Sequence, residues 1–394
     1  MYKVRGYLQS YDWGKKYQDS IISKFLGLDK DIYKNELICS ELWYGTHLNG
    51  ESYLGELDCK LKDYYEQELP FLFKILSIDK CLSIQVHPDL DHAKLLHEIN
   101  PKIYKDPNPK PEMVLALSEM EILMGFKHKN DLNFIVNLYP MFGECIGFDE
   151  ISTIKDLFQN LFRNNLDFGN ETNNNSNQNN NLIQETISSM IYQIDFKMKN
   201  SLVIYDFEKL FLKLFQQYKY DIGLLASLFL NYIILKPLEC IYIEPNTIHA
   251  YISGECLECM ANSDNVVRAG LTNKYKDLDT LFKITNFKSQ NVYKIEPNNL
   301  LNSKCKIYKP ESLLFQFIYI QIENESINLS NYFIDSNQNA QFILVLNGCG
   351  IIKNQNSYKF ISQGDCIFQD SRQNQNLSIA NLSNIALQIV ICTN

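Results

Sequence analysis

The stretch LPFLFKILSIDKCLSIQVHP (69–88) decides the fold class, because it contains two apolar runs separated by a polar Asp–Lys pair. Apolar runs of this length, bounded by polar residues, are typical of buried β-strands. The second run ends on Gln85 and His87, and residues two apart in a strand point to the same face. We therefore predict two strands that follow each other in the chain, of which the second carries polar side chains into the interior of a β structure.

Outside this stretch, hydrophobic periodicity predicts a β domain that is interrupted by helices and followed by a second β domain. Short strands and turns characterise 1–128 and return at 233–290, whereas 129–232 places apolar residues at the three- and four-residue intervals of amphipathic helices. Residues 291–394 contain short strands at regular spacing, typical of an antiparallel sandwich or barrel. We expect a mainly β protein in which 1–128 and 233–290 form one discontinuous domain around the helical insert.

The helical insert contains an Asn-rich tract, NETNNNSNQNNN (170–181). A tract of this composition cannot bury apolar surface, so we predict a disordered loop. An aggregation-prone or binding segment is the alternative to a tolerated surface insertion, and we favour the insertion.

Composition limits the classes of protein and partner. The 394 residues suffice for two or three domains, and 45% hydrophobic with 21% charged residues is ordinary for a soluble globular protein. A net charge of −9 without a Lys/Arg run argues against nucleic acid as a partner. We see no apolar leader and no segment of membrane-spanning length, and the eleven scattered cysteines are typical of reduced thiols. We expect a cytoplasmic monomer that binds neither membrane nor nucleic acid.

Four residues form a candidate metal site. A buried polar row is costly unless a partner satisfies it, and a metal ion is one such partner. His249 ends an apolar strand much as His87 does, and Glu112 stands immediately before another apolar run. Gln85, His87, Glu112 and His249 therefore offer the nitrogen and oxygen ligands that zinc takes, although each alone is compatible with an ordinary hydrogen-bonded residue. No histidine follows His249, so we expect no histidine-based metal site in 291–394.

Several charged residues stand in or beside apolar strands of the same domain. Lys74 lies inside the first apolar run, Arg268 lies within VVRAGLT, and Lys274 follows it. Glu258 and Asp264 stand in the preceding segment, CLECMANSDN. Structural ion pairs would explain isolated charges, but several of both signs beside a metal site favour an anion-binding active site.

The sequence resembles the type I mannose-6-phosphate isomerases. The matching stretches are YDWGK (11–15), ELWYGTH (41–47), LPFLFKILSIDKCLSIQVHPD (69–89), KPEMVLAL (110–117), GF (125–126) and HAYISGECLECMANSDNVVRAGLTNKYKDL (249–278). They run in family order and cover most of the first β domain. The sequence departs from the usual family pattern at Pro109, where a histidine is common, and at Leu90, where a lysine is common; neither is an expected metal ligand.

The resemblance implies a zinc-dependent aldose–ketose isomerase. Such an enzyme interconverts mannose 6-phosphate and fructose 6-phosphate through a cis-enediol and supplies mannose 6-phosphate for GDP-mannose synthesis and glycosylation. The implied fold is a cupin-type jelly roll with a helical insert, followed by a second jelly roll without a metal site. The implied ligands of one zinc ion per chain are Gln85, His87, Glu112 and His249.

The resemblance also implies roles around the metal. Arg268 and Glu258 would be catalytic, with Glu258 or a water as the proton carrier. The side chains expected to bind the sugar phosphate, which is the only partner we expect, are Lys74, Ser83, Lys110, Tyr251, Asp264 and Lys274.

Two other functions compete with isomerisation. An Fe(II) dioxygenase of the cupin class usually needs more histidines than this chain offers, and glutamine is an unusual iron ligand. A non-catalytic sugar-binding cupin would keep the pocket without turnover. Oxygen uptake tests the first alternative, and an assay for fructose 6-phosphate formation tests the second.

Overall fold

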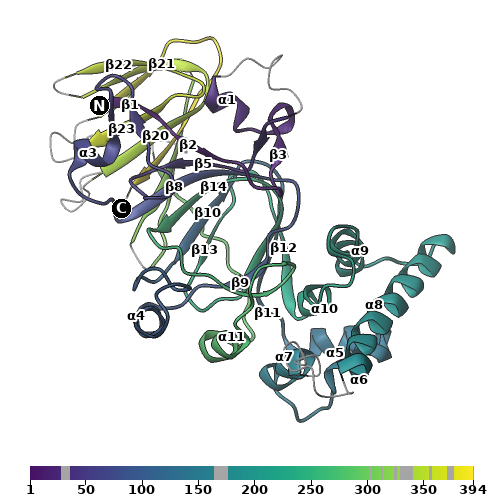
Figure 1. Cartoon of the computed structure of the whole chain (residues 1–394). Helices are drawn as coiled ribbons and strands as arrows, with labels where there is room; N and C mark the ends of the chain where they lie inside the picture. Colours follow the sequence, from purple (N-terminus) through teal and green to yellow (C-terminus); the bar gives the residue numbers. More distant parts are fainter. Residues whose placement is uncertain are drawn as a thin grey trace.

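The computed structural model describes residues 1–27, 36–163, 176–300, 304–311, 314–323, 326–328, 340–354, 357–370 and 377–393. In these ranges the chain forms two β regions that lie against each other and a group of helices beside the first (Figure 1). The prediction of a mainly β fold with a helical insert is confirmed. Within the described ranges, no helix combines the length and the apolar character needed to cross a membrane.

The first β region is a ten-stranded sheet with the path β12-β11-β14-β8-β5-β2, to which four further strands attach. Its strands are β2 (Tyr7–Gln9), β5 (Glu41–Tyr44), β8 (Phe71–Ile78), β9 (Ile84–Val86), β10 (Glu112–Ala116), β11 (Met120–Phe126), β12 (Leu230–Leu235), β13 (Cys240–Ile243), β14 (His249–Ala261) and β15 (Val267–Gly270). β8 and β9 are the two strands predicted from the apolar runs, and β8 is buried along its whole length.

β14 is the strand that organises this sheet. His249 to Ser253 pair with β11, and Gly254 to Ala261 pair with β8. The change of partner falls at Gly254, whose φ of 116° is a conformation that side chains with a Cβ rarely adopt. A Cβ there would lie 2.6 Å from the carbonyl oxygen of Glu119. The glycine thus lets one strand contribute residues to two walls of the β region.

The second β region combines strands from both ends of the chain. Its nine-stranded sheet contains β1 (Tyr2–Arg5), β6 (Tyr53–Leu54), β7 (Cys59–Lys60), β16 (Asn298–Leu300), β17 (Cys305–Tyr308), β18 (Gln316–Ile322), β20 (Ala340–Asn347), β23 (Cys366–Asp370) and β25 (Leu387–Thr393). A four-stranded sheet contains β19 (Ser326–Asn328), β21 (Cys349–Lys353), β22 (Tyr358–Ser362) and β24 (Ser378–Asn381). A separate pair is β3 (Lys15–Lys16) with β4 (Ile38–Cys39).

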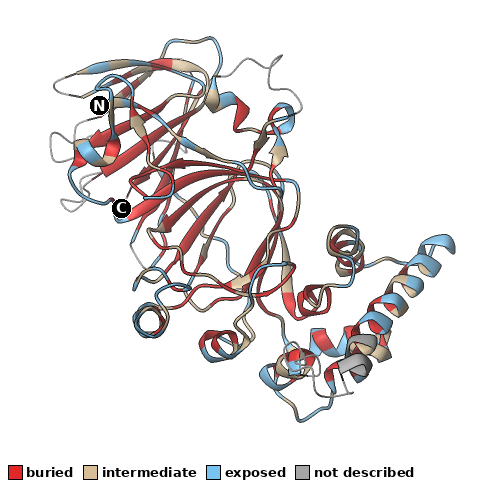
Figure 2. Cartoon of the chain, viewed as in Figure 1, coloured by how far each residue is buried: buried red, intermediate tan, exposed pale blue. Residues whose placement is uncertain are grey.

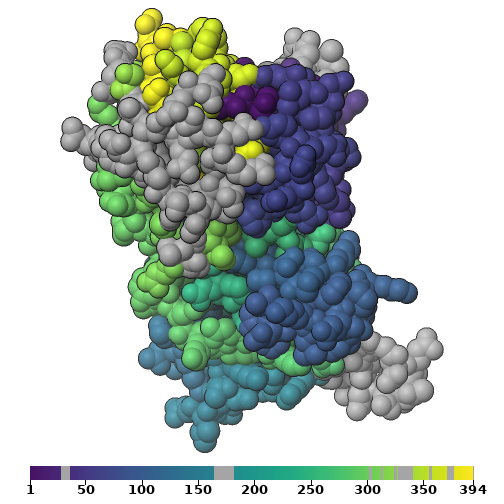
Figure 3. Space-filling view, turned by 90° about the vertical axis from the view of Figure 1, so that its left-hand side faces the viewer, coloured from purple at the N-terminus to yellow at the C-terminus, as the bar shows by residue number. Residues whose placement is uncertain are grey.

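The N-terminal strand therefore crosses the expected domain boundary, since Tyr2 pairs with Phe368 of β23. In Figure 3 the purple N-terminal residues and the yellow C-terminal residues meet at the same end of the molecule. The division into 1–128 with 233–290 and 291–394 stays a prediction, and the sheets share strands across it.

The helical insert lies between β11 and β12. Its helices are α5 (Lys129–Leu138), α6 (Pro140–Ile146), α7 (Ile154–Arg163), α8 (Ser176–Lys199), α9 (Asp206–Tyr218) and α10 (Gly223–Ser227). Other helices are η1 (Tyr17–Asp19), α1 (Ser23–Leu26), α3 (Leu61–Tyr65), α4 (Leu90–Ile99) and α11 (Leu278–Ile284). Part of the Asn-rich tract, 170–175, lies outside the described residues, and 176–181 forms the start of α8 where we expected a loop.

Burial concentrates on the strands, as the red colouring of Figure 2 shows. The two β regions share an aromatic core in which Phe73 of β8 lies 6.2 Å from Phe342 and 6.1 Å from Phe317, measured between ring centroids. Each fully buried phenylalanine contributes roughly 1.5–3 kcal/mol relative to exposure. This core holds β8 rigidly from one side, while its other face lines the candidate site.

Candidate metal centre

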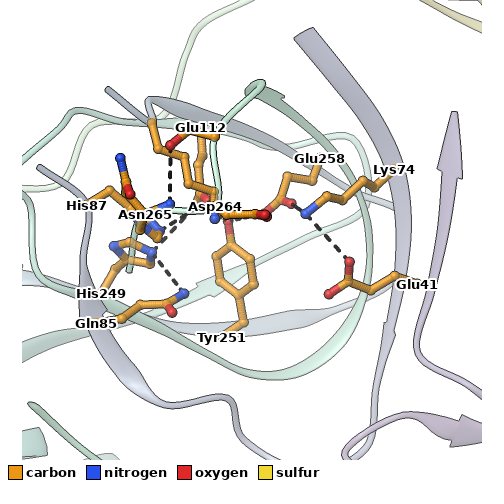
Figure 4. Close-up of polar contacts among 12 residues, drawn as sticks. Glu41, Lys74, Gln85, His87, Glu112, His249, Tyr251, Glu258, Asp264 and Asn265 are labelled. Carbon is orange, nitrogen blue, oxygen red and sulfur yellow. Dashed lines mark hydrogen bonds and ion pairs between the residues drawn. The ribbon is translucent and has the colours of Figure 1, made fainter. Parts of the chain in front are cut away.

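The four predicted ligands meet at one place because of strand register. His249, the first residue of β14, pairs with Gln85 of β9 through their Cα positions. His87 follows β9 directly, and Glu112 is the first residue of β10, which pairs with β14. Figure 4 shows all four side chains converging. Three separate stretches of the chain thus supply one cluster.

The cluster is compact and buried. His87 Nε2 lies 3.3 Å from Glu112 Oε1, and His249 Nε2 lies 3.4 Å from Glu112 Oε2. One potential ligand atom from each of these residues lies within 4.8 Å of the others. The Gln85 amide nitrogen is 3.5 Å from His249 Nε2, and a half-turn of the amide places its oxygen there. The set offers two imidazole nitrogens, a carboxylate and an amide oxygen.

Both imidazoles are oriented by backbone carbonyls. His87 Nδ1 donates to the carbonyl of Asn265 at 2.7 Å, and His249 Nδ1 donates to that of Thr247 at 2.9 Å. A carbonyl only accepts, so each Nδ1 carries the hydrogen and each Nε2 is left with its lone pair facing Glu112. This arrangement of the second ring nitrogen is typical of metal-ligating histidines.

The electrostatics of the cluster call for a cation. Burial, and to a lesser extent the Lys110 ammonium, lowers the pKa of His87 to about 4, so its ring is neutral at pH 7. Burial opposes ionisation of Glu112, but the charges around it, foremost the Lys110 ammonium, hold the pKa of that carboxyl well below its usual range. Among the described residues His87 Nε2, although buried, has no hydrogen-bond partner. A lone pair and a carboxylate facing each other without a hydrogen fit a divalent ion between them.

Tyr251 and Lys110 contact the same carboxylate from the cavity side. Lys110 Nζ lies 3.1 Å from Glu112 Oε1. The Tyr251 hydroxyl lies 3.2 Å from Glu112 Oε2 and donates to Glu258 Oε1 at 2.9 Å. Burial and the neighbouring carboxylates raise the pKa of Tyr251 well above its usual range, so the hydroxyl stays a donor. Tyr251 thereby connects the metal ligand to Glu258.

Glu258 is held in a buried ion pair. Its Oε2 accepts from Lys74 Nζ at 2.9 Å, and Lys74 also lies 3.5 Å from Glu41. Burial opposes the charge on Lys74, but Glu258 and Glu41 together raise the pKa of the ammonium. Burial raises the pKa of Glu258, an effect that Lys74 opposes. Lys74 is therefore charged at neutral pH and serves as a donor. Of the two carboxyls that Tyr251 contacts, Glu258 has a raised pKa and Glu112 a lowered one, so Glu258 is the more basic.

A cavity of ≈ 850 Å³ opens onto these groups. Ten of the predicted site residues line it: Lys74, Ser83, Gln85, Lys110, Glu112, Tyr251, Glu258, Asp264, Arg268 and Lys274. His87 and His249 are not among its lining residues, but they contact Glu112, which is. Residues that the sequence did not single out as site residues also line it, including Lys80, Lys105, Lys219, Asp221 and Thr272. They stand in turns whose sequences carry no periodic signal, and only the folded chain brings them together.

The cations of the cavity differ in how they are paired. In the described parts of the chain, no ion pair involves Arg268 of β15, which lies beside Gln85, or the exposed Lys274. Asp264, by contrast, faces His47 Nε2 at 3.3 Å and accepts from Asn49 at 2.9 Å. The sequence did not mark His47 as a site residue, because the short motif that it ends has no alternation of apolar and polar residues. The unpaired cations leave the cavity able to bind an anion.

The mainly β fold and the buried His–Glu–His group together define a cupin-type protein with a divalent-metal centre. The family described as phosphomannose isomerase type I, catalytic domain, matches residues 1–129. The chain is 37% identical over 320 residues to a probable mannose-6-phosphate isomerase of Echinococcus multilocularis, covering 73% of each chain. It is 32% identical over 398 residues to mannose-6-phosphate isomerase 1 of Arabidopsis thaliana, covering 93% of this chain and 88% of the relative.

The fold is also that of solved structures. Mannose 6-phosphate isomerase from Salmonella typhimurium, in its apo form, superposes with a TM-score of 0.80 at 22% identity and covers 100% of this chain. The chain belongs to the type I mannose-6-phosphate isomerase family.

Proposed function

We propose that this protein is a zinc-dependent aldose–ketose isomerase that interconverts mannose 6-phosphate and fructose 6-phosphate and supplies mannose 6-phosphate for GDP-mannose synthesis and glycosylation. The observation that carries the proposal is the buried group of His87, Glu112 and His249, in which Glu112 lines a cavity that also holds Arg268 and Lys274. Family membership supports the reaction, and a structural neighbour of this family is described as holo and zinc bound.

Gln85, His87, Glu112 and His249 would hold one zinc ion. When bound, zinc supplies Lewis-acid polarisation of the sugar oxygens. The donor set suits this ion because borderline-soft zinc accepts imidazole nitrogen together with carboxylate oxygen.

The reaction moves a proton between C1 and C2 of the open-chain sugar through a cis-enediol. It needs a base and donors for the developing oxygen charge. We assign proton transfer to Glu258, because its carboxylate is buried and its pKa is raised by that burial. Lys74 and Tyr251 donate to its two oxygens and fix its orientation. Lys74 itself stays protonated and therefore acts as a donor.

We assign anion recognition to the cavity cations that form no ion pair within the described ranges. We assign Arg268 to the enediolate oxygens, since its planar donors bind oxyanions in fixed geometry. Lys274 and Ser83 line the cavity with it and would bind the phosphate dianion by charge-assisted hydrogen bonds. Lys74, Lys110, Tyr251 and Asp264 would contact the sugar.

The test is a coupled assay for fructose 6-phosphate formation from mannose 6-phosphate, before and after treatment with a chelator. We expect turnover that chelation abolishes and added zinc restores. Binding of mannose 6-phosphate without turnover would instead support the non-catalytic sugar-binding cupin. Turnover that is indifferent to exhaustive chelation would refute a metal-dependent mechanism.

We also propose that the protein acts as a cytoplasmic monomer. Its eleven cysteines are free thiols, which is typical of reducing compartments. Light scattering of the purified protein tests the mass, and imaging of the tagged protein in its cells tests the compartment.

A further inference from the structure

The turn that follows β15 carries cavity residues in an unusual backbone conformation. Arg268 lies on β15, and Leu271, Thr272, Asn273 and Lys274 line the cavity after it. Leu271 has a φ of 55°, in the left-handed region that costs a residue with a Cβ about 1–2 kcal/mol. The surrounding structure must therefore stabilise this turn.

Asp221, between α9 and α10 of the helical insert, supplies that stabilisation. Its Oδ1 accepts from the backbone amide of Leu271 at 2.7 Å, and its Oδ2 accepts from that of Thr272 at 3.4 Å. Its own orientation is fixed, because Oδ1 also accepts from the backbone amide of Gly223 at 2.6 Å. A carboxylate on the insert thus satisfies two amides of the turn.

Close backbone packing brings the two segments together. A Cβ on Gly270 would lie 2.5 Å from the Cα of Gly223, and a Cβ on Gly223 would lie 2.4 Å from the amide nitrogen of Leu271. A Cβ less than 3 Å from backbone atoms would force one of the two segments to move. Both glycines are therefore required for Asp221 to reach the turn.

We propose that Asp221 is a positioning residue of the active site, through which the helical insert holds the turn 271–274 in the conformation that presents Lys274 and Thr272 to the phosphate of the substrate. This inference rests on the proposed isomerase function. Asp221 acts through backbone amides, so its replacement should displace the Lys274 ammonium while leaving that side chain present. Because phosphate contacts are equally strong before and during the chemical step, their loss raises KM more than it lowers kcat.

The experiment measures kcat and KM for mannose 6-phosphate in Asp221→Ala, Asp221→Asn and Gly223→Ala. We expect KM to rise about tenfold or more in Asp221→Ala, with a smaller fall in kcat and unchanged zinc content. The KM of Asp221→Asn should lie between those of wild type and Asp221→Ala, since an amide oxygen can still accept from the backbone amide of Leu271. Gly223→Ala should also raise KM, although it changes no charge. The inhibition constant of inorganic phosphate should rise in parallel.

A double-mutant cycle separates positioning from general loss of structure. In the Lys274→Ala background, Asp221→Ala should raise KM further by only a small factor, because the group that it positions is gone. Asp149→Asn is the matched control, since Asp149 also accepts from backbone amides in the insert, at Ile151 and Ser152, away from the cavity. KM within twofold of wild type in both Asp221→Asn and Gly223→Ala would overturn the proposal. Wild-type protein without turnover would instead refute the proposed function.

Discussion

Lys74 and Glu258 stand directly opposite each other on β8 and β14 and form a buried ion pair, with 2.9 Å between Nζ and Oε2. Their side chains are only 7% and 4% exposed. Because Glu258 also accepts from Tyr251, and Tyr251 contacts Glu112, the pair belongs to one network with the metal ligands. The protonation of Glu258 therefore depends on Lys74.

Removing one partner of this pair should be costly. Lys74→Met leaves the Glu258 carboxylate buried without its ammonium, which costs about 3–5 kcal/mol when a buried pair is broken in this way. We expect a fall of that size in the free energy of unfolding in urea, and a loss of turnover. Lys62→Met, which breaks the exposed Lys62–Glu68 pair at 3.0 Å, is the control and should cost about 1 kcal/mol or less. Equal losses in the two variants would contradict the assignment.

His249→Ala should lose bound zinc. The imidazole is fully buried, and its Nε2 is held toward Glu112 by the Nδ1 hydrogen bond, so no neighbouring side chain replaces it. Metal analysis of the purified variant provides the measurement, with His128→Ala, an exposed histidine, as the control. The chelator should lower the melting temperature of wild type but leave His249→Ala unchanged, because only a protein that binds the ion is stabilised by it. Full zinc occupancy in His249→Ala would remove it from the ligand set.

The metal site was predictable because its ligands are marked locally. Gln85 and His87 interrupt the end of an apolar run, and Glu112 stands where the next run begins. His249 was predicted to end a strand as His87 does, and the structure corrects this, because His249 is the first residue of β14. Asp221 and His47 were not predictable, since each acts through residues more than 45 positions away in the sequence. The pairing of Tyr2 with Phe368 likewise has no local signal, because register between distant strands depends on the assembled core.

The start of α8 shows how packing overrides composition. The Asn-rich tract has no apolar residue of its own, but Ile183, Ile187, Met190 and Ile194 recur at three- and four-residue intervals and are buried. Once these residues fix the helix against α6, each further residue adds a hydrogen bond at low entropic cost, and the helix extends back to Ser176. Intrinsic helix propensity alone would have placed the start of α8 later in the sequence, after the Asn-rich tract.

Lys127, which follows β11, should make stability depend on pH at the alkaline side. Burial lowers the pKa of its partly buried ammonium to about 8, against 10.5 for an ordinary lysine, and Asp131 opposes the shift. The unfolded chain thus binds this proton more tightly than the folded chain does. The buried charge therefore lowers the free energy of unfolding at pH 7, and this destabilisation disappears as the pH rises from 8 to 10.5.

Lys127→Met should therefore raise the free energy of unfolding at pH 7 by about 1–3 kcal/mol, a range that allows for screening by solvent. The advantage over wild type should shrink toward zero at pH 10. Urea unfolding of both proteins at pH 7 and pH 10 measures this difference in the free energy of unfolding. Lys94 is exposed, so Lys94→Met is the control and should stay within about 0.5 kcal/mol of wild type at both pH values. A difference that does not change with pH would rule out the buried charge as its source.

Arg268→Ala should lower kcat by about two to three orders of magnitude while zinc stays bound, because one donor to developing oxygen charge contributes roughly that much. Burial lowers the pKa of the guanidinium, which nevertheless stays charged at neutral pH. Arg268→Lys keeps the charge but not the planar pair of donors, so it should recover only part of the loss. Arg163→Ala, at the exposed end of α7, controls for loss of a surface charge. If kcat were unchanged and only KM rose, Arg268 would bind the phosphate together with Lys274 and would not act on the enediolate.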